Sequence, residues 1–233
     1  MCPSDTQEDD VKLSRQLSRT VAVAIVTLPA VLFAQENVEK PEMGFFITSE
    51  GLGNGGDLGG LAGADAHCQA LADEAGAGHR TWRAYLSTQA TGDEAAINAR
   101  DRIGNGPWAN ANGDVIGADV DDLHYSNANI RYEFALDENG DTVNSAAMDD
   151  SPNRHDILTG TQLDGTAFPP GDDRTCSNWT SSDEGAAMVG HHDRFRFTTP
   201  GSPWNEAHPS RGCSQEALVG TGGDGLFYCF AAD

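Results

Sequence analysis

Apolar residues along the chain fall into short runs with strand-like or helix-like spacing, and long loops rich in glycine and asparagine separate them. The clearest strand-like run is TWRAYLST, residues 81–88. Every second residue from Trp82 to Leu86 is apolar, which places these side chains on one face of a strand. The other predicted strands are short apolar segments at 43–49, 114–116, 130–136, 178–181, 186–189 and 226–230.

Helical spacing is confined to one long segment. Residues 62–75 place alanines and a leucine on one face and stop at Gly76, which predicts a helix with Cys68 on or near its buried side. Residues 118–123 predict a single helical turn. Between 92 and 175 regular structure is sparse, and Asn-Gly pairs mark turns. The pattern therefore predicts one loop-rich α+β domain with one or two helices and short antiparallel strands.

The beginning of the chain has the pattern of a secretory signal peptide. Three basic residues precede an apolar run from Val21 to Ala34, which is shorter than the roughly 20 residues of a membrane-spanning helix. An uncleaved anchor is the alternative. We expect a protein that is secreted, periplasmic or at the cell surface, with no membrane span after the signal is removed. The predicted division is a signal peptide at 1–34, a linker at 35–42 and one domain at 43–233.

The chain is strongly acidic, with 36 aspartates and glutamates, 14 lysines and arginines, and a formal net charge of −22. Such a surface repels polyanions, so nucleic acid and heparin are poor partners and cations are better ones. Solubility in salty water is an equally good explanation of the acidity.

The cysteines indicate an oxidised protein. Of the five, Cys2 lies in the predicted signal peptide, which leaves Cys68, Cys176, Cys213 and Cys229. An even number in an exported chain predicts two disulfides, and the sequence alone leaves all three pairings open.

Two parts of the sequence resemble a known family. The segment GGLAGADAHCQALADEAGAGHRTWRAYLST, residues 59–88, is similar to the opening of endostatin-like domains, with a Gly-rich entry, a helical cysteine and an Arg-Ala-aromatic-Leu-Ser strand. Cys176 with Trp179, then the Trp204-Asn205-Glu206 run, Cys213 and residues 226–229 resemble the closing half of C-type-lectin-like domains. The resemblance covers residues 43–233 and is specific at the two ends.

The resemblance implies the fold and its covalent links. It implies a C-type-lectin-like fold of the endostatin-like (collagen XV/XVIII C-terminal) type, with an outer Cys68–Cys229 bond and an inner Cys176–Cys213 bond nested within it. The outer bond joins the predicted helix to the last strand. Closure of so long a loop stabilises a chain by up to roughly 5 kcal/mol in the chain-entropy model.

A calcium site is one candidate for chemistry. In C-type lectins the residues equivalent to Asn205 and Glu206 hold a calcium ion that binds sugar hydroxyls, and Asp183 and Glu184 are the nearest acids that could complete such a site. Endostatin-like members generally lack this site. The alternative is that Trp204 is a core residue and that Asn205 and Glu206 are loop residues.

A second candidate is a histidine-rich set. His191, His192, Asp193 and His208 suit zinc or another borderline metal. Neighbouring histidines on a strand point to opposite faces, so only one of the first two can join His208. The alternative is one buried, hydrogen-bonded histidine beside one that faces solvent. The zinc site of endostatin itself uses N-terminal histidines and does not carry over, because residues 35–43 contain none.

These patterns favour a binding protein over an enzyme. We expect a non-catalytic carbohydrate-binding domain that contacts its ligand through Trp204, Asn205, Glu206 and His208, with calcium as the candidate cofactor. The alternative is an adhesive protein that binds a surface protein, or itself, through the same fold. A hydrolase is the third hypothesis, although no nucleophile elbow or similar local signature is present.

Overall fold

The computed structural model describes residues 40–126, 129–194 and 203–233. Every feature described below belongs to one compact unit within residues 39–233. The predicted signal peptide at 1–34 and most of the predicted linker lie outside the described residues. None of the described helices is long and apolar enough to cross a membrane.

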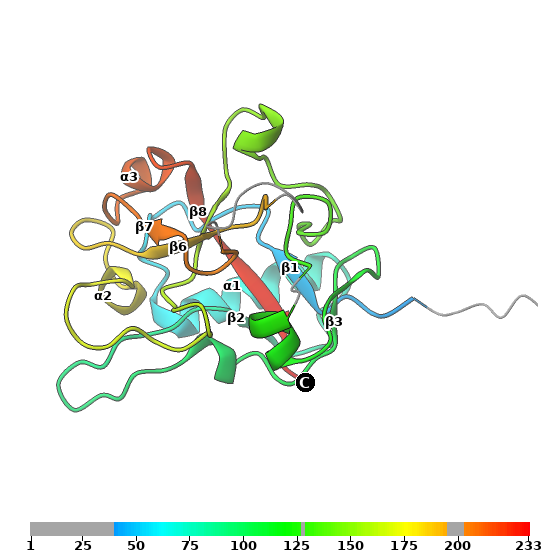
Figure 1. The fold of residues 1–233 in the computed structure, drawn as a ribbon, viewed down its shortest axis with the longest axis horizontal. Helices are drawn as coiled ribbons and strands as arrows, with labels where there is room; N and C mark the ends of the chain where they lie inside the picture. Colours follow the sequence, from blue (N-terminus) through cyan, green and yellow to red (C-terminus); the bar gives the residue numbers. More distant parts are fainter. Residues whose placement is uncertain (1–39, 127–128, 195–202) are drawn as a thin grey trace, which may run out of the picture. The chain divides into compact units, whose positions relative to one another are not determined.

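The domain has mixed α and β structure with few helices and short strands (Figure 1). The strands are β1 (Phe45–Ile47), β2 (Trp82–Ala84), β3 (Trp108–Ala109), β4 (Val115–Gly117), β5 (Asp156–Leu158), β6 (Met188–His191), β7 (His208–Pro209) and β8 (Gly223–Ala231). The helices are α1 (Gly60–Glu74), α2 (Cys176–Trp179) and α3 (Gln215–Val219), with single turns at Ala99–Asp101, Asp122–Ser126 and Ala146–Met148.

The nine-residue strand β8 is the centre of the main sheet, whose order is β1-β8-β5-β6-β7, with β2 also paired to β8. Most pairs are antiparallel, as expected, but β5 runs parallel to β8. The pairing of β5 with β6 places Asp156 opposite His191, and the pairing of β6 with β7 places Val189 opposite His208. A separate pair consists of β3 and β4.

The side chains of β8 alternate between two hydrophobic clusters, one on each face of the sheet. Phe227 and Cys229 pack with residues of α1 and with Trp82 and Trp179. Leu226, Tyr228 and Phe230 pack on the other face with Phe45, Tyr85, Trp108 and Trp204. Figure 1 shows β8 in red beside β1, with α1 across one face. Because both faces of β8 pack in apolar clusters, its residues 226–231 form a continuous hydrophobic run.

The structure confirms both disulfides. Cys68 of α1 is bonded to Cys229 of β8, and Cys176 is bonded to Cys213 within the span that the first bond closes. The resemblance had implied this nesting.

Two predicted strands are wrong. Residues 131–134 form a turn in which the Phe134 and Ala135 N–H groups donate to the Arg131 carbonyl. Residues 178–181 begin within α2, a turn in which Cys176 to Trp179 all have positive φ. There the Asn178 side chain donates to the carbonyl of Gln89 and accepts from its N–H, so a side chain makes the contacts that a strand backbone would make.

The other predicted elements are confirmed with shifted ends. The long helix begins two residues earlier than predicted, at Gly60. The turn predicted at 118–123 is helical but centred later, at Asp122–Ser126. The strand β5 had no counterpart in the prediction, and it carries part of the site described next.

Candidate functional site

Strand register brings one carboxylate and two histidines to the same face of the sheet. Asp156 and His191 are directly opposed across an antiparallel pair, so their side chains lie on the same face. His208 is opposite Val189, two residues before His191, and residues two apart on a strand share a face. His155 stands just before β5, outside the strand, and its ring also reaches Asp156.

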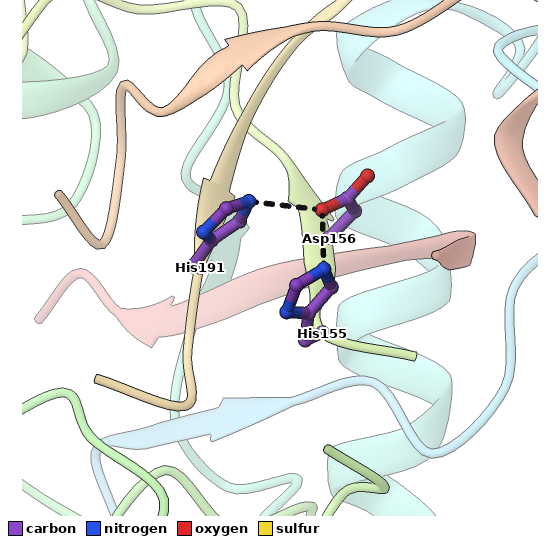
Figure 2. A group of neighbouring side chains, drawn as sticks. All are labelled: His155, Asp156 and His191. Carbon is purple, nitrogen blue, oxygen red and sulfur yellow. Dashed lines mark ion pairs between the residues drawn. The ribbon is translucent and has the colours of Figure 1, made fainter. Parts of the chain in front are cut away.

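Three histidine nitrogens converge on one oxygen of Asp156. Its Oδ1 atom lies 3.2 Å from Nε2 of His155, 3.1 Å from Nε2 of His191 and 3.5 Å from Nε2 of His208. The Nε2 atoms of His191 and His208 are 3.1 Å apart. Figure 2 shows the His155 and His191 rings turned toward the same carboxylate oxygen. We call these four residues the His3Asp cluster.

The carboxylate at the centre of the His3Asp cluster is buried. The side chain of Asp156 is 1% exposed, and neither of its oxygens has a hydrogen-bond partner among the described residues. The histidine nitrogens are at ion-pair distance, yet none of these approaches to Asp156 has the geometry of a hydrogen bond. A buried carboxylate is costly unless it is paired or coordinates a metal, and the side chains placed to pair with this one are the three histidines.

Asp193 contacts the His155 ring at the nitrogen that does not face Asp156. The His155 Nδ1 lies 3.2 Å from Oδ2 of Asp193, and the same oxygen accepts a 2.7 Å hydrogen bond from the Ser145 hydroxyl. Burial lowers the pKa of His155, but the hydrogen bond and charge of Asp193 and the charge of Asp156 outweigh it, so the pKa is raised. Burial raises the pKa of Asp193, but hydrogen bonds from His155 and Ser145 reverse this and keep it ionised. A histidine oriented by a carboxylate is the usual arrangement around a bound metal.

His192 faces away from the cluster. It is fully buried, and its Nε2 lies 3.3 Å from the Asn144 carbonyl oxygen. Burial lowers its pKa to about 4, so the ring is neutral near neutral pH. The expectation that only one of His191 and His192 can meet His208 is confirmed, and His192 does not belong to the cluster.

Four of the six ligand separations in the His3Asp cluster match those of ligands around a tetrahedral metal. Zinc–nitrogen bonds of 2.0–2.1 Å place neighbouring ligands of a regular tetrahedron about 3.3 Å apart. The four separations given above are between 3.1 and 3.5 Å. Among the described residues, His155, Asp156 and His191 are the only group of at least three His, Cys, Asp or Glu whose ligand atoms all lie within 4.8 Å of one another.

The donor set selects among metals. Three imidazoles and one carboxylate suit zinc and its first-row neighbours, whereas calcium takes six to eight oxygens. The cluster therefore fits a borderline transition-metal ion and does not fit calcium.

The acids predicted to bind calcium are not brought together. Glu206 accepts a 2.5 Å hydrogen bond from the Leu163 N–H, whereas Asp183 and Glu184 line an open pocket beside Ser177 and Gly185. Within the part of the chain that the structure describes, these three carboxylates form no group of the kind that could share an ion.

Trp204 and Asn205, predicted as ligand contacts, lie in the core. The Trp204 ring packs 4.7 Å from Tyr85 and 5.3 Å from Tyr228 between ring centroids. The amide nitrogen of Asn205 donates to the hydroxyl of Tyr85 and to two loop carbonyls. Both residues are less than 5% exposed, so the structure does not support them as surface contacts. His208, the fourth predicted contact, is in the cluster.

The sequence interpretation missed His155 and Asp156. The only local signal is the run His-Asp-Ile-Leu, residues 155–158, in a stretch interpreted as loop. The chain matches no protein-family model, and no curated protein is significantly similar to it. The structure thus shows a disulfide-linked α+β domain with a cluster of three histidines around one buried carboxylate.

Proposed function

We propose that this chain is an exported, non-catalytic domain that binds one transition-metal ion of the zinc class through the His3Asp cluster. The observation that carries the proposal is the buried Asp156 carboxylate, which has three histidine nitrogens within 3.5 Å and no hydrogen bond. The ion would supply the positive charge that this carboxylate requires.

The ion would also connect three neighbouring strands. Its ligands come from β5, β6 and β7, and β7 is a two-residue edge strand. A metal that binds the folded but not the unfolded chain stabilises the folded state by mass action. We infer that the ion fixes this edge of the sheet.

Export and fold family belong to the same proposal. Two disulfides are typical of proteins outside the reducing cytoplasm. Their nesting is the one implied by the resemblance to endostatin-like, C-type-lectin-like domains, and this agreement supports that fold family for the chain.

Metal analysis of the full chain, purified oxidised and without chelator, tests the metal proposal. We expect about one zinc per chain in the wild type, and none in Asp156→Asn or His191→Ala. His79→Ala is the matched control, because the His79 side chain is 62% exposed and its ion pair is with Glu42, outside the cluster. A wild-type protein that neither retains zinc nor takes it up on addition would overturn the metal proposal.

Glycan recognition is a second candidate, favoured by one exposed aromatic side chain. Tyr125 is 62% exposed, and Arg100 holds it through a 2.8 Å hydrogen bond to its hydroxyl, with the guanidinium 5.5 Å from the ring centre. An exposed aromatic ring held in place is typical of binding surfaces. A glycan array with the wild type and Tyr125→Ala tests it. Binding that is lost in the variant supports this candidate, and no binding by the wild type contradicts it.

A further inference from the structure

The ligands of the His3Asp cluster differ in how firmly they are held. The side chains of His155 and His191 are 19% and 13% exposed, whereas that of His208 is 40% exposed. Asp193 orients the His155 ring, and the His191 ring stacks on it with centroids 4.4 Å apart and planes within 13°. The His208 ring packs edge-on to that of His191, with centroids 5.0 Å apart, and outside the cluster its one hydrogen-bond contact among the described residues is the carbonyl of its own neighbour Pro209, 3.1 Å from its Nδ1.

Position in the sheet reinforces this difference. His155 and Asp156 adjoin the inner strand β5, and His191 ends β6, whereas His208 begins the edge strand β7. His208 approaches His191 and Asp156, but it is not part of the group whose ligand atoms all lie within 4.8 Å of one another. His155, Asp156 and His191 are thus a complete three-ligand set without it.

Three protein ligands are the number found in zinc sites that keep one position for an outside molecule, whereas closed structural sites use four. We propose, on the basis of the metal site proposed above, that His155, Asp156 and His191 are the permanent ligands and that His208 is an exchangeable fourth ligand. When His208 leaves, its position accepts a neutral nitrogen donor from solvent, of the class of an imidazole side chain on a peptide.

The charge of the site favours a neutral fourth ligand over an anionic one. A divalent ion is balanced by the carboxylates of Asp156 and Asp193, so an anionic fourth ligand would leave the site negative. The chain as a whole carries −22, which further disfavours the approach of an anion. A neutral imidazole adds no charge and matches the donor that it replaces.

Cobalt(II) substitution in the full chain tests the inference, because the visible spectrum of bound cobalt reports its coordination independently of any activity. His208→Ala is expected to bind about one cobalt per chain with a spectrum altered from the wild type. Millimolar imidazole should then restore the wild-type band shape, and acetate at the same concentration should not. His208→Gln provides a second variant with a side chain of similar length, and His79→Ala should behave as the wild type.

The outcomes separate this inference from the metal proposal. If the wild type binds no cobalt or zinc, the metal proposal fails. If the wild type binds cobalt but both His208 variants lose it as completely as His191→Ala, His208 is a permanent ligand and only this inference fails. Bound cobalt that does not respond to imidazole, or that responds better to acetate, also overturns it.

Discussion

The Nδ1 atom of His155 lies 3.2 Å from Oδ2 of Asp193, a residue 38 positions later in the chain. Its other ring nitrogen lies 3.2 Å from Asp156. One imidazole therefore connects a carboxylate at the centre of the cluster to a second carboxylate behind it, and this relationship leads to the first prediction.

Asp193→Asn should weaken metal binding without abolishing it. The amide keeps the shape of the side chain but removes the charge that orients His155, and loss of such an outer partner typically lowers metal affinity by about 10- to 100-fold. Competition with a chromophoric chelator measures the affinity. Asp183→Asn, which removes an acid outside the cluster, should leave it unchanged, and equal affinities of Asp193→Asn and wild type would show that Asp193 plays no part.

Zinc should raise the melting temperature of the wild type. At a free concentration 100 times its dissociation constant, a ligand that binds only the folded state adds about 2.7 kcal/mol. For a domain of this size the gain corresponds to a rise of roughly 5–11 °C. Differential scanning calorimetry with zinc and with chelator measures it, and identical transitions in both would contradict the prediction.

Asp156→Asn should distinguish the destabilisation caused by burying the carboxylate from the stability that the carboxylate provides by binding metal. Without metal, the variant should be at least as stable as the wild type, because it removes a buried charge with no hydrogen bond. With zinc the order should reverse, since only the wild type gains stability. Urea denaturation under both conditions tests this. A metal-free variant that is clearly less stable than the metal-free wild type would contradict this prediction.

The two disulfides should differ in their contributions to stability. The outer bond separates its cysteines by 161 residues and the inner bond by 37. In the chain-entropy model these loops correspond to about 5 and about 4 kcal/mol. Replacing each cysteine pair by serines and comparing urea denaturation should give the larger loss for Cys68 and Cys229. The reverse order would show that packing, and not loop length, dominates.

Stability should fall as the pH drops below about 6.5, partly through His124. Burial lowers the pKa of His124, whose Nε2 lies 2.7 Å from the buried Tyr85 hydroxyl. Because the folded state binds the proton less readily than the unfolded state, this contribution is complete above pH 6.5 and is lost as the pH falls through the lowered pKa. The difference in melting temperature between pH 7.5 and 5.5 should be smaller in His124→Gln than in the wild type. The exposed control His79→Ala should show the wild-type difference.

Local patterns predicted the elements that carry their own periodicity. The apolar run at 226–230 and the helical spacing at 62–75 correspond to β8 and α1. The segment at 178–181 misled the prediction, because the disulfide at Cys176 and the pairing of Asn178 with Gln89 hold it in a left-handed turn. That constraint is a long-range one, and no local pattern shows it.

Part of the candidate site could be predicted from local patterns, whereas the rest depends on long-range contacts. Alternation along a strand separated His191 from His192 and joined it to His208, and the structure agrees. Asp156 could not be found in this way, because it meets His191 only through strand pairing across 35 residues and belongs to a three-residue strand with no pattern of its own. The sequence analysis grouped Asp193 with His191 and His208, but it did not predict the contact of Asp193 with His155.

The dependence of the cluster on strand pairing has a practical consequence. Asp156 faces His191, and His208 faces Val189, only in the native register. A slip of one residue between β5 and β6 would turn the opposing side chain to the other face of the sheet. Metal uptake would then serve as a quality check on refolded or recombinant protein, because misaligned molecules with both disulfides formed would still fail to retain the ion.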